Sequence, residues 1–277
     1  MDTNLTAVAH AAEASLTESH RRLGLFVDAK KQRRFQDWFI PRHASDGRAL
    51  ETIFQEWLSD DRKYMLRILG ETGAGKTTLK DYLFLQLAER VLRSDSDRIP
   101  VEMNFAEAVN AVTSAGGQSD AIDLGPRNEV IFLDGHEGRL AALEDRATVV
   151  RGTKVVVLQR DAIIRSTPSV TRLASISSTV DGCTTTWLRS LTPEEARKAV
   201  ELFFPIALEE RGATSEPLVW QEERLSVLRS GAFDGLLVSP AMAHQLCRMA
   251  ADPGIEMRSN QDHGRWAFRA ASVPSRF

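Results

Sequence analysis

The chain has 277 residues, of which 43% are hydrophobic and 26% charged, as expected for a globular protein of one large domain or two small ones. Its net charge of −3 gives no general case for binding nucleic acid or a membrane surface. The two cysteines, Cys183 and Cys247, lie far apart and in no metal-binding or redox spacing. No signal peptide and no apolar stretch of roughly 18 residues occur. The sequence therefore predicts a cytoplasmic protein with reduced thiols.

The first 46 residues are interpreted as a tail followed by a basic helical segment. Residues 21–42 contain seven lysines and arginines against two aspartates. Such a run is either the solvated face of a helix or a contact for nucleic acid or a partner protein, and both alternatives stay open. Aromatic residues interleaved with the charges indicate that part of the segment docks on the main domain, and Pro41 ends it. A further helix is predicted over residues 47–59 from the spacing of its apolar residues.

A glycine-rich loop follows a short apolar stretch at residues 64–69, which has the pattern of a buried strand. The next residues match the phosphate-binding P-loop, or Walker A, pattern and are Gly70, Glu71, Thr72, Gly73, Ala74, Gly75, Lys76 and Thr77. A helix is predicted after the loop, up to about residue 92. Glycines let the backbone curl its N–H groups inward, and the helix N-terminus adds partial positive charge. We expect Lys76 to reach the β- and γ-phosphates of a nucleotide and Thr77 to hold Mg²⁺.

Three further strands are predicted along the chain. Residues 99–105 form the second strand, and residues 129–133 form a buried strand that ends in Asp134, which is a Walker B pattern. Because ligands bind at the carboxyl ends of strands in open α/β sheets, we expect Asp134 to hold Mg²⁺ directly or through water. Residues 154–160 form the next strand, after a crossover helix at 139–147. Its β-branched run indicates burial on both faces, and Arg160 at its end either contacts the γ-phosphate or pairs with a surface acid.

The pattern changes near residue 190. After a fifth strand at 184–188, Thr192, Pro193 and Glu195 have the signature of a helix N-terminus with a capping box. Helices are also predicted at 218–230 and 240–250, the last with Met242, Ala243, Leu246 and Met249 buried. The predicted fold is thus an α/β P-loop NTPase of the ASCE type, with a parallel sheet flanked by helices at 47–190. A small all-helical domain at 191–277 follows it.

Taken together, these motifs resemble the NACHT branch of the STAND NTPases, which are relatives of the AAA+ ATPases. The loop matches the family from Leu69 through Thr78 to Leu79, the Asp134-Gly135 pair matches its Walker B motif, and Gln159-Arg160 matches the end of its sensor strand. Leu191-Thr192-Pro193-Glu194-Glu195 and Ser239-Pro240 match its helical domain. The resemblance covers about residues 50–250. It implies that Thr78 contributes to nucleotide binding and that Pro240 packs near the nucleotide.

The chain departs from the family at its acidic residues. Glu137 and Gly138 stand where the family usually has two extra acids, so Glu137 is the only nearby candidate for orienting the attacking water. It is either the catalytic base, a residue that supports the magnesium ligands, or a surface acid. His136 is interpreted as a turn residue. Neither a winged helix nor a repeat array follows, so the expectation is a truncated relative of the family.

The resemblance implies a nucleotide-gated switch for signalling or assembly, with ATP, ADP and Mg²⁺ as ligands and slow hydrolysis. Catalysis would rest on Lys76, Glu137 and Arg160. Self-association or a protein partner would accompany the switch, whereas no membrane partner is expected. Two alternatives remain: an active ATPase that works on nucleic acid through residues 21–42, and a degenerate fragment that only binds nucleotide. No Asn-Lys-x-Asp motif is present, which disfavours a GTPase.

Overall fold

The computed structural model describes residues 39–103, 129–135, 154–160, 182–231, 233, 236–260 and 265–270. Their contacts divide them into two compact units. The first unit holds Pro41–Thr72 and the described residues within Lys76–Arg189, and the second holds residues 39–40, Gly73–Gly75 and the described residues from Ser190 onward. The sequence-based domain limits of 1–46, 47–190 and 191–277 stay a proposal, because compactness alone does not show independent folding.

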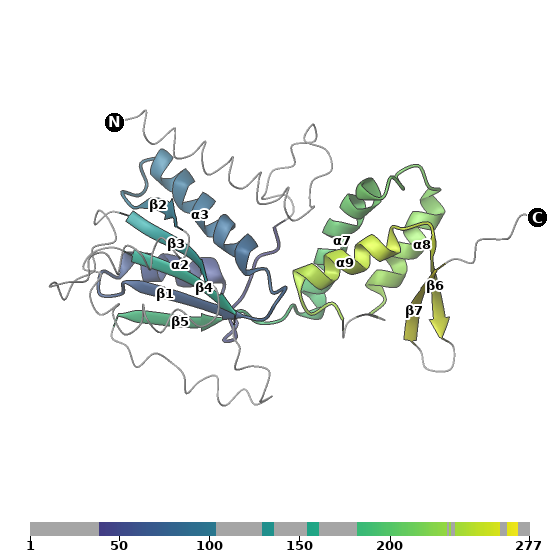
Figure 1. Ribbon diagram of the computed structural model, residues 1–277, viewed down its shortest axis with the longest axis horizontal. Coiled ribbons are helices and arrows are strands. Elements are labelled where there is room, and N and C mark those ends of the chain that lie inside the picture. The colour runs from purple at the N-terminus through teal and green to yellow at the C-terminus, as the bar shows by residue number, and fades with distance from the viewer. Residues whose placement is uncertain are drawn as a thin grey trace, which may run out of the picture. The chain divides into compact units, whose positions relative to one another are not determined.

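The first unit is built on a five-stranded parallel sheet (Figure 1). Its strands are β1 (Met65–Gly70), β2 (Ile99–Glu102), β3 (Glu129–Gly135), β4 (Lys154–Arg160) and β5 (Cys183–Trp187). They lie in the order β2-β3-β4-β1-β5, and every pair is parallel. The predicted α/β fold with a parallel sheet is confirmed. Residues 130–133 and 154–158 are buried at the centre of the sheet, as their continuous apolar runs predict.

Two helices pack on one face of this sheet, α2 (Leu50–Ser59) and α3 (Lys76–Leu92). The ring of Phe132 on β3 lies 6.1 Å from that of Phe54 on α2 and 5.4 Å from that of Phe84 on α3. The buried stripe of α2 is the predicted one and consists of Leu50, Ile53, Phe54, Trp57 and Leu58. Since one aromatic ring contacts both helices, α2 and α3 share the face of the sheet to which Phe132 points (Figure 1).

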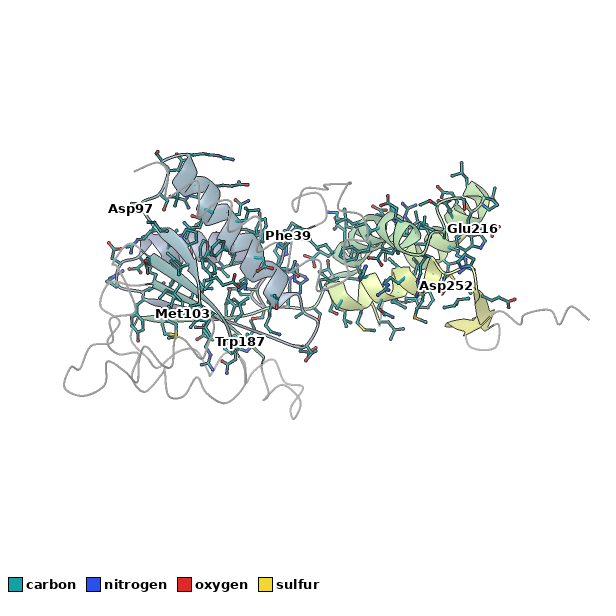
Figure 2. All side chains as sticks on the ribbon, turned by 45° about the horizontal axis from the view of Figure 1, so that its top comes forward. Phe39, Asp97, Met103, Trp187, Glu216 and Asp252 are labelled. Carbon is teal, nitrogen blue, oxygen red and sulfur yellow. The ribbon has the colours of Figure 1, made fainter. Side chains whose placement is uncertain are left out.

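A short strap before α2 holds the end of β5. Ala44 and Leu188 form an isolated antiparallel bridge, and Ser45 N–H donates to the carbonyl of Trp187 at 2.8 Å. The buried Arg42 adds a bond from Nη2 to the carbonyl of Arg189 at 2.7 Å. Trp187 and Met103, both labelled in Figure 2, mark the carboxyl ends of the two edge strands β5 and β2. The strap therefore fixes the backbone up to the last residue of the first unit.

The second unit begins with the helices α7 (Pro193–Glu210), α8 (Leu218–Arg229) and α9 (Pro240–Ala250). The capping box of α7 is confirmed, because Thr192 Oγ1 accepts from Glu195 N–H and Glu195 Oε2 accepts from Thr192 N–H. The core of the unit is formed by residues of α7 and α9, which include Ala199, Val200, Phe203, Phe204, Ala243, Leu246, Cys247 and Ala250. Met242, which the pattern places in the core, is 40% exposed instead.

The second unit is not all-helical as the sequence analysis predicts. After α9 the chain forms an antiparallel hairpin from β6 (Ile255–Asn260) and β7 (Arg265–Ala270), in which Met257 pairs with Phe268. Arg224 of α8 attaches its start, since Nη1 donates to the carbonyl of Ala250 at 2.8 Å and Nη2 to that of Ile255 at 2.6 Å. Asp252, labelled in Figure 2, lies between these two carbonyls in the chain. The helical prediction thus holds only as far as residue 250.

Several predicted segments lie outside the described residues. They are most of the N-terminal segment 1–46 and the crossover helix at 139–147. Among the described residues, no helix is long and apolar enough to cross a membrane.

Candidate functional site

The P-loop lies where the sequence places it, between the end of β1 at Gly70 and the start of α3 at Lys76. Gly73 and Gly75 adopt φ angles of +79° and +84°, a region that side chains disfavour and glycine tolerates. These two left-handed residues, with one residue between them, turn the chain back toward the helix start and make the loop a compact turn. Of the two glycines that the motif fixes, Gly70 and Gly75, only Gly75 has this conformation.

The N-terminus of α3 is open to an anion. In the described part of the chain, the N–H groups of Gly73, Ala74 and Gly75 donate no backbone hydrogen bond. The first turn of α3 contains no acidic residue, whereas that of α7 contains Glu194 and Glu195 and is closed by a capping box. Backbone N–H groups without a partner carry partial positive charge at a helix start. The loop therefore has the donors that a phosphate group requires.

Lys76 adds a full positive charge at this point. Its Nζ donates to the carbonyls of Gly70 at 2.7 Å and Glu71 at 2.6 Å, so the ammonium group lies against the loop. A lysine in the first turn of a helix is unfavourable for stability, because the helix dipole is positive there. A residue that breaks a local stability rule indicates a functional position. Phosphate oxygens would compete with the two carbonyls for the Nζ protons.

The predicted magnesium positions occupy the same edge of the sheet. Thr77 and Thr78 lie half-buried in the first turn of α3. Asp134 is the sixth residue of β3, and its backbone pairs with Leu158 of β4. Positions 132 and 134 share a face of the strand, and Phe132 points to α3. Position 134 thus lies on the α3 face at the carboxyl edge, where a magnesium ligand facing Thr77 would have to stand.

Comparisons with known proteins concern the fold. No protein-family model and no curated protein matches the chain. The structure is similar to Drosophila ORC bound to DNA, with 14% identity, a TM-score of 0.38, and coverage of 72% of this chain and 58% of that one. It is also similar to Hsp104 in its closed state with ATPγS and FITC casein, at 16% identity, a TM-score of 0.42, and coverage of 73% and 37%. A third is the FIGL-1 AAA domain with ADP, at 15% identity, a TM-score of 0.34, and coverage of 70% and 61%.

These low identities and TM-scores carry no argument about what this chain binds, and the chain spans less than two thirds of each of the three structures. What decides the fold is the sheet itself. It is parallel throughout, β4 lies between β1 and β3, and the P-loop follows β1. The fold is therefore a parallel α/β fold of the P-loop type.

The backbone of Arg160 lies beside the P-loop, and Glu137 is not described. The backbone of Arg160, the last residue of β4, pairs with Gly70 at the start of the P-loop. Its neighbour Gln159 accepts a hydrogen bond from Arg67 Nε at 2.9 Å, so the side chains of Gln159 and Arg67 connect β4 with β1. Whether Arg160 reaches a γ-phosphate stays a prediction. Glu137 and His136 lie outside the described residues, and their predicted roles stay predictions as well.

Pro240 occupies the first position of α9, after the N-cap Ser239, whose side chain accepts from Met242 N–H. It belongs to the same unit as the turn Gly73–Gly75. A Cβ added to Gly75 would lie 3.5 Å from Pro240 Cγ, which is ordinary van der Waals contact. The role of Pro240 in binding a nucleotide stays a prediction.

Two residues near this site are absent from the sequence-based set. Lys80 of α3 and Glu102 of β2 form an ion pair, although Lys80 is buried. Lys80 follows Lys76 by four residues, and Glu102 is the last residue of its strand. Glu102 is an acid at the end of a strand, and such a position indicates a candidate site residue. The sequence alone does not show with which helix residue it pairs. Among the described residues, no group of three metal-binding side chains occurs.

Proposed function

We propose that the chain binds ATP and ADP with Mg²⁺ at the loop from Gly70 to Thr77 and acts as a nucleotide-dependent switch. One observation carries the proposal: three backbone N–H groups without backbone partners adjoin a helix start that has a lysine and no acid. This combination fits a polyphosphate, because the N–H groups, the helix start and the lysine place positive charge at one point.

The residues of the proposed site would have separate roles. The loop N–H groups and Lys76 bind the phosphates, while Thr77 and Asp134 hold Mg²⁺, which neutralises charge on the phosphate oxygens when bound. Arg160 would add positive charge at the γ-phosphate, and Glu137 would orient water. With Glu137 as the only nearby acid after Asp134, we expect hydrolysis to be slow. The adenine preference and the contact with Pro240 rest on the resemblance to the NACHT proteins.

The switch also rests on that resemblance. A ligand that binds two arrangements of the loop with different affinity shifts the equilibrium between them. ADP and ATP differ by the γ-phosphate, whose charge would meet Lys76. We propose that this difference drives self-association.

Mass spectrometry of nucleotide retained through purification tests the switch, together with size measurement after ATP is added. The expected result is retained ADP and an increase in mass when ATP replaces it. Nucleotide-free protein that hydrolyses ATP rapidly and stays a monomer would contradict the switch. It would leave the binding site itself in place.

Asp134→Ala is expected to remove the Mg²⁺ dependence of nucleotide binding. The carboxylate is the proposed metal ligand from β3, and Mg²⁺ requires oxygen ligands in near-octahedral geometry. The affinity for ATP measured in EDTA should stay unchanged, whereas the added affinity in Mg²⁺ should be lost. Titration calorimetry in both buffers gives the two values. If Mg²⁺ still strengthens binding to the same extent, Asp134 is not a ligand.

A further inference from the structure

Lys80 is a buried charge in the helix that follows the P-loop. Its side chain is 7% exposed, and its Nζ pairs with Glu102 at the end of β2 and lies 3.4 Å from Asp81 Oδ1. Asp81 is buried as well, with 8% of its side chain exposed, whereas Glu102 is 44% exposed. Lysine is rarely buried to this degree unless it is paired, since desolvation of the ammonium is costly. The sequence thus keeps a costly ionic cluster at this place.

The place of the cluster is set by helix and strand periodicity. Lys80 and Asp81 follow Lys76 and Thr77 by four residues, so each lies one turn further along the same stripe of α3. Glu102 pairs in register with Phe132, two residues before Asp134. The cluster therefore lies next to the proposed magnesium ligands, further from the carboxyl edge of the sheet. It joins α3, which carries Thr77, to β2, which pairs with the strand that carries Asp134.

We propose that Lys80 is a positioning residue for the magnesium site. Through Glu102 it sets the separation between the first turn of α3, which carries Thr77, and the end of β3, which carries Asp134. Mg²⁺ binds oxygen ligands at about 2.0–2.1 Å with little tolerance, so a small shift of α3 against β3 weakens metal binding. The proposal rests on the proposed function, and it adds a residue that touches neither the nucleotide nor the metal.

A second buried lysine offers a matched control. Lys154, 3% exposed, is the first residue of β4 and thus stands at the opposite end of the sheet from the P-loop. Its Nζ donates to the carbonyls of Trp57, Asp60 and Lys63 at 2.8, 2.9 and 2.8 Å. Loss of this ammonium leaves three carbonyls without their donor and destabilises the first unit. It does not change the strand and helix ends that would hold Mg²⁺.

The experiment compares Lys80→Met, Glu102→Gln and Lys154→Met in the full chain. For each variant, the affinity for ATP is measured by calorimetry in Mg²⁺ and in EDTA, and the ratio of the two affinities reports the metal contribution. Lys80→Met and Glu102→Gln should each lower this ratio by about tenfold, as outer partners of metal ligands do. The double variant should lose little more than the larger single loss, because the two residues act as one pair. Lys154→Met should lower the melting temperature and leave the ratio unchanged.

The outcomes separate this inference from the proposed function. An unchanged ratio in folded Lys80→Met, or an equal loss in Lys154→Met, would overturn the positioning role. If Lys80→Met fails to fold, Glu102→Gln decides by the same ratio, since glutamine keeps the size and an acceptor oxygen. Wild-type protein that binds ATP with no effect of Mg²⁺ also overturns the inference but leaves nucleotide binding standing. Wild-type protein that binds no nucleotide refutes the proposed function itself.

Discussion

Lys76→Ala is expected to lower the affinity for ATP by about ten- to a hundredfold while leaving the fold intact. A charge-assisted contact to phosphate contributes roughly 1.5–3 kcal/mol, and each 1.4 kcal/mol corresponds to a factor of ten in affinity. The side chain contacts the carbonyls of Gly70, which is buried, and of Glu71, which is exposed, so that water can replace the second contact after the change. Loss of a positive charge from the start of α3 also relieves an unfavourable interaction with the helix dipole. The change should therefore act on binding and not on stability.

Calorimetric titration with ATP and thermal unfolding of the same samples measure both effects. Lys198→Ala is the matched control, because Lys198 lies on the exposed face of α7 and pairs with Glu194 at 2.9 Å. That surface pair contributes little, so the control should resemble wild type in both measurements. Nucleotide affinity equal to that of wild type in Lys76→Ala would refute binding at this loop.

The sheet and the loop were predictable because each rests on a strong local signal. Continuous apolar runs gave the buried strands, and the glycine pattern gave the turn whose positive φ angles at Gly73 and Gly75 only glycine adopts readily. The capping box before α7 was equally local, since Thr192 and Glu195 satisfy each other within one turn. Such features depend on residues close in the chain, and the sequence shows those directly.

The predictions that were wrong concern features that depend on contacts between elements distant in the chain. The hairpin of β6 and β7 carries an alternating sequence pattern, and in its register Ile255 pairs with Ala270 and Met257 with Phe268, but each run is short and charged residues interrupt it. Met242 fits a helical stripe, yet it is exposed because the buried face of α9 is centred on Ala243, Leu246 and Cys247. These outcomes depend on which element packs against which, and periodicity alone does not give the partner.

The site shows the same division. The P-loop residues could be named from the sequence, whereas Lys80 and Glu102 could not be joined, since 22 positions and a change from helix to strand separate them. Their contact follows from the parallel register of β2 on β3 and the packing of α3 on that face. The roles proposed for Glu137 and Arg160 follow from their positions in the motifs.

Gly182 is the position at which the fold tolerates a side chain least among the described glycines. Its φ is +83°, and a Cβ built there would lie 2.6 Å from Tyr64 Cδ1, closer still to Cε1, and 3.0 Å from the Arg62 carbonyl. The Gly182 carbonyl also accepts from Tyr64 N–H at 2.9 Å, which joins the entries of β1 and β5. A side chain at position 182 would therefore collide with the Tyr64 ring and the Arg62 carbonyl, and the structure could not accommodate it without strain.

Gly182→Ala should lower the free energy of unfolding by about 2–5 kcal/mol, from roughly 1–2 for the left-handed backbone and 1–3 for the overlap. Gly47→Ala is the matched control, since Gly47 has a φ of +86° and an added Cβ would meet nothing within 4 Å. It should cost only the backbone term, so the difference between the two variants isolates the contact with Tyr64 and Arg62. Urea unfolding followed by circular dichroism measures both. Equal losses would show that Tyr64 moves aside freely and that Gly182 is needed only for its backbone conformation.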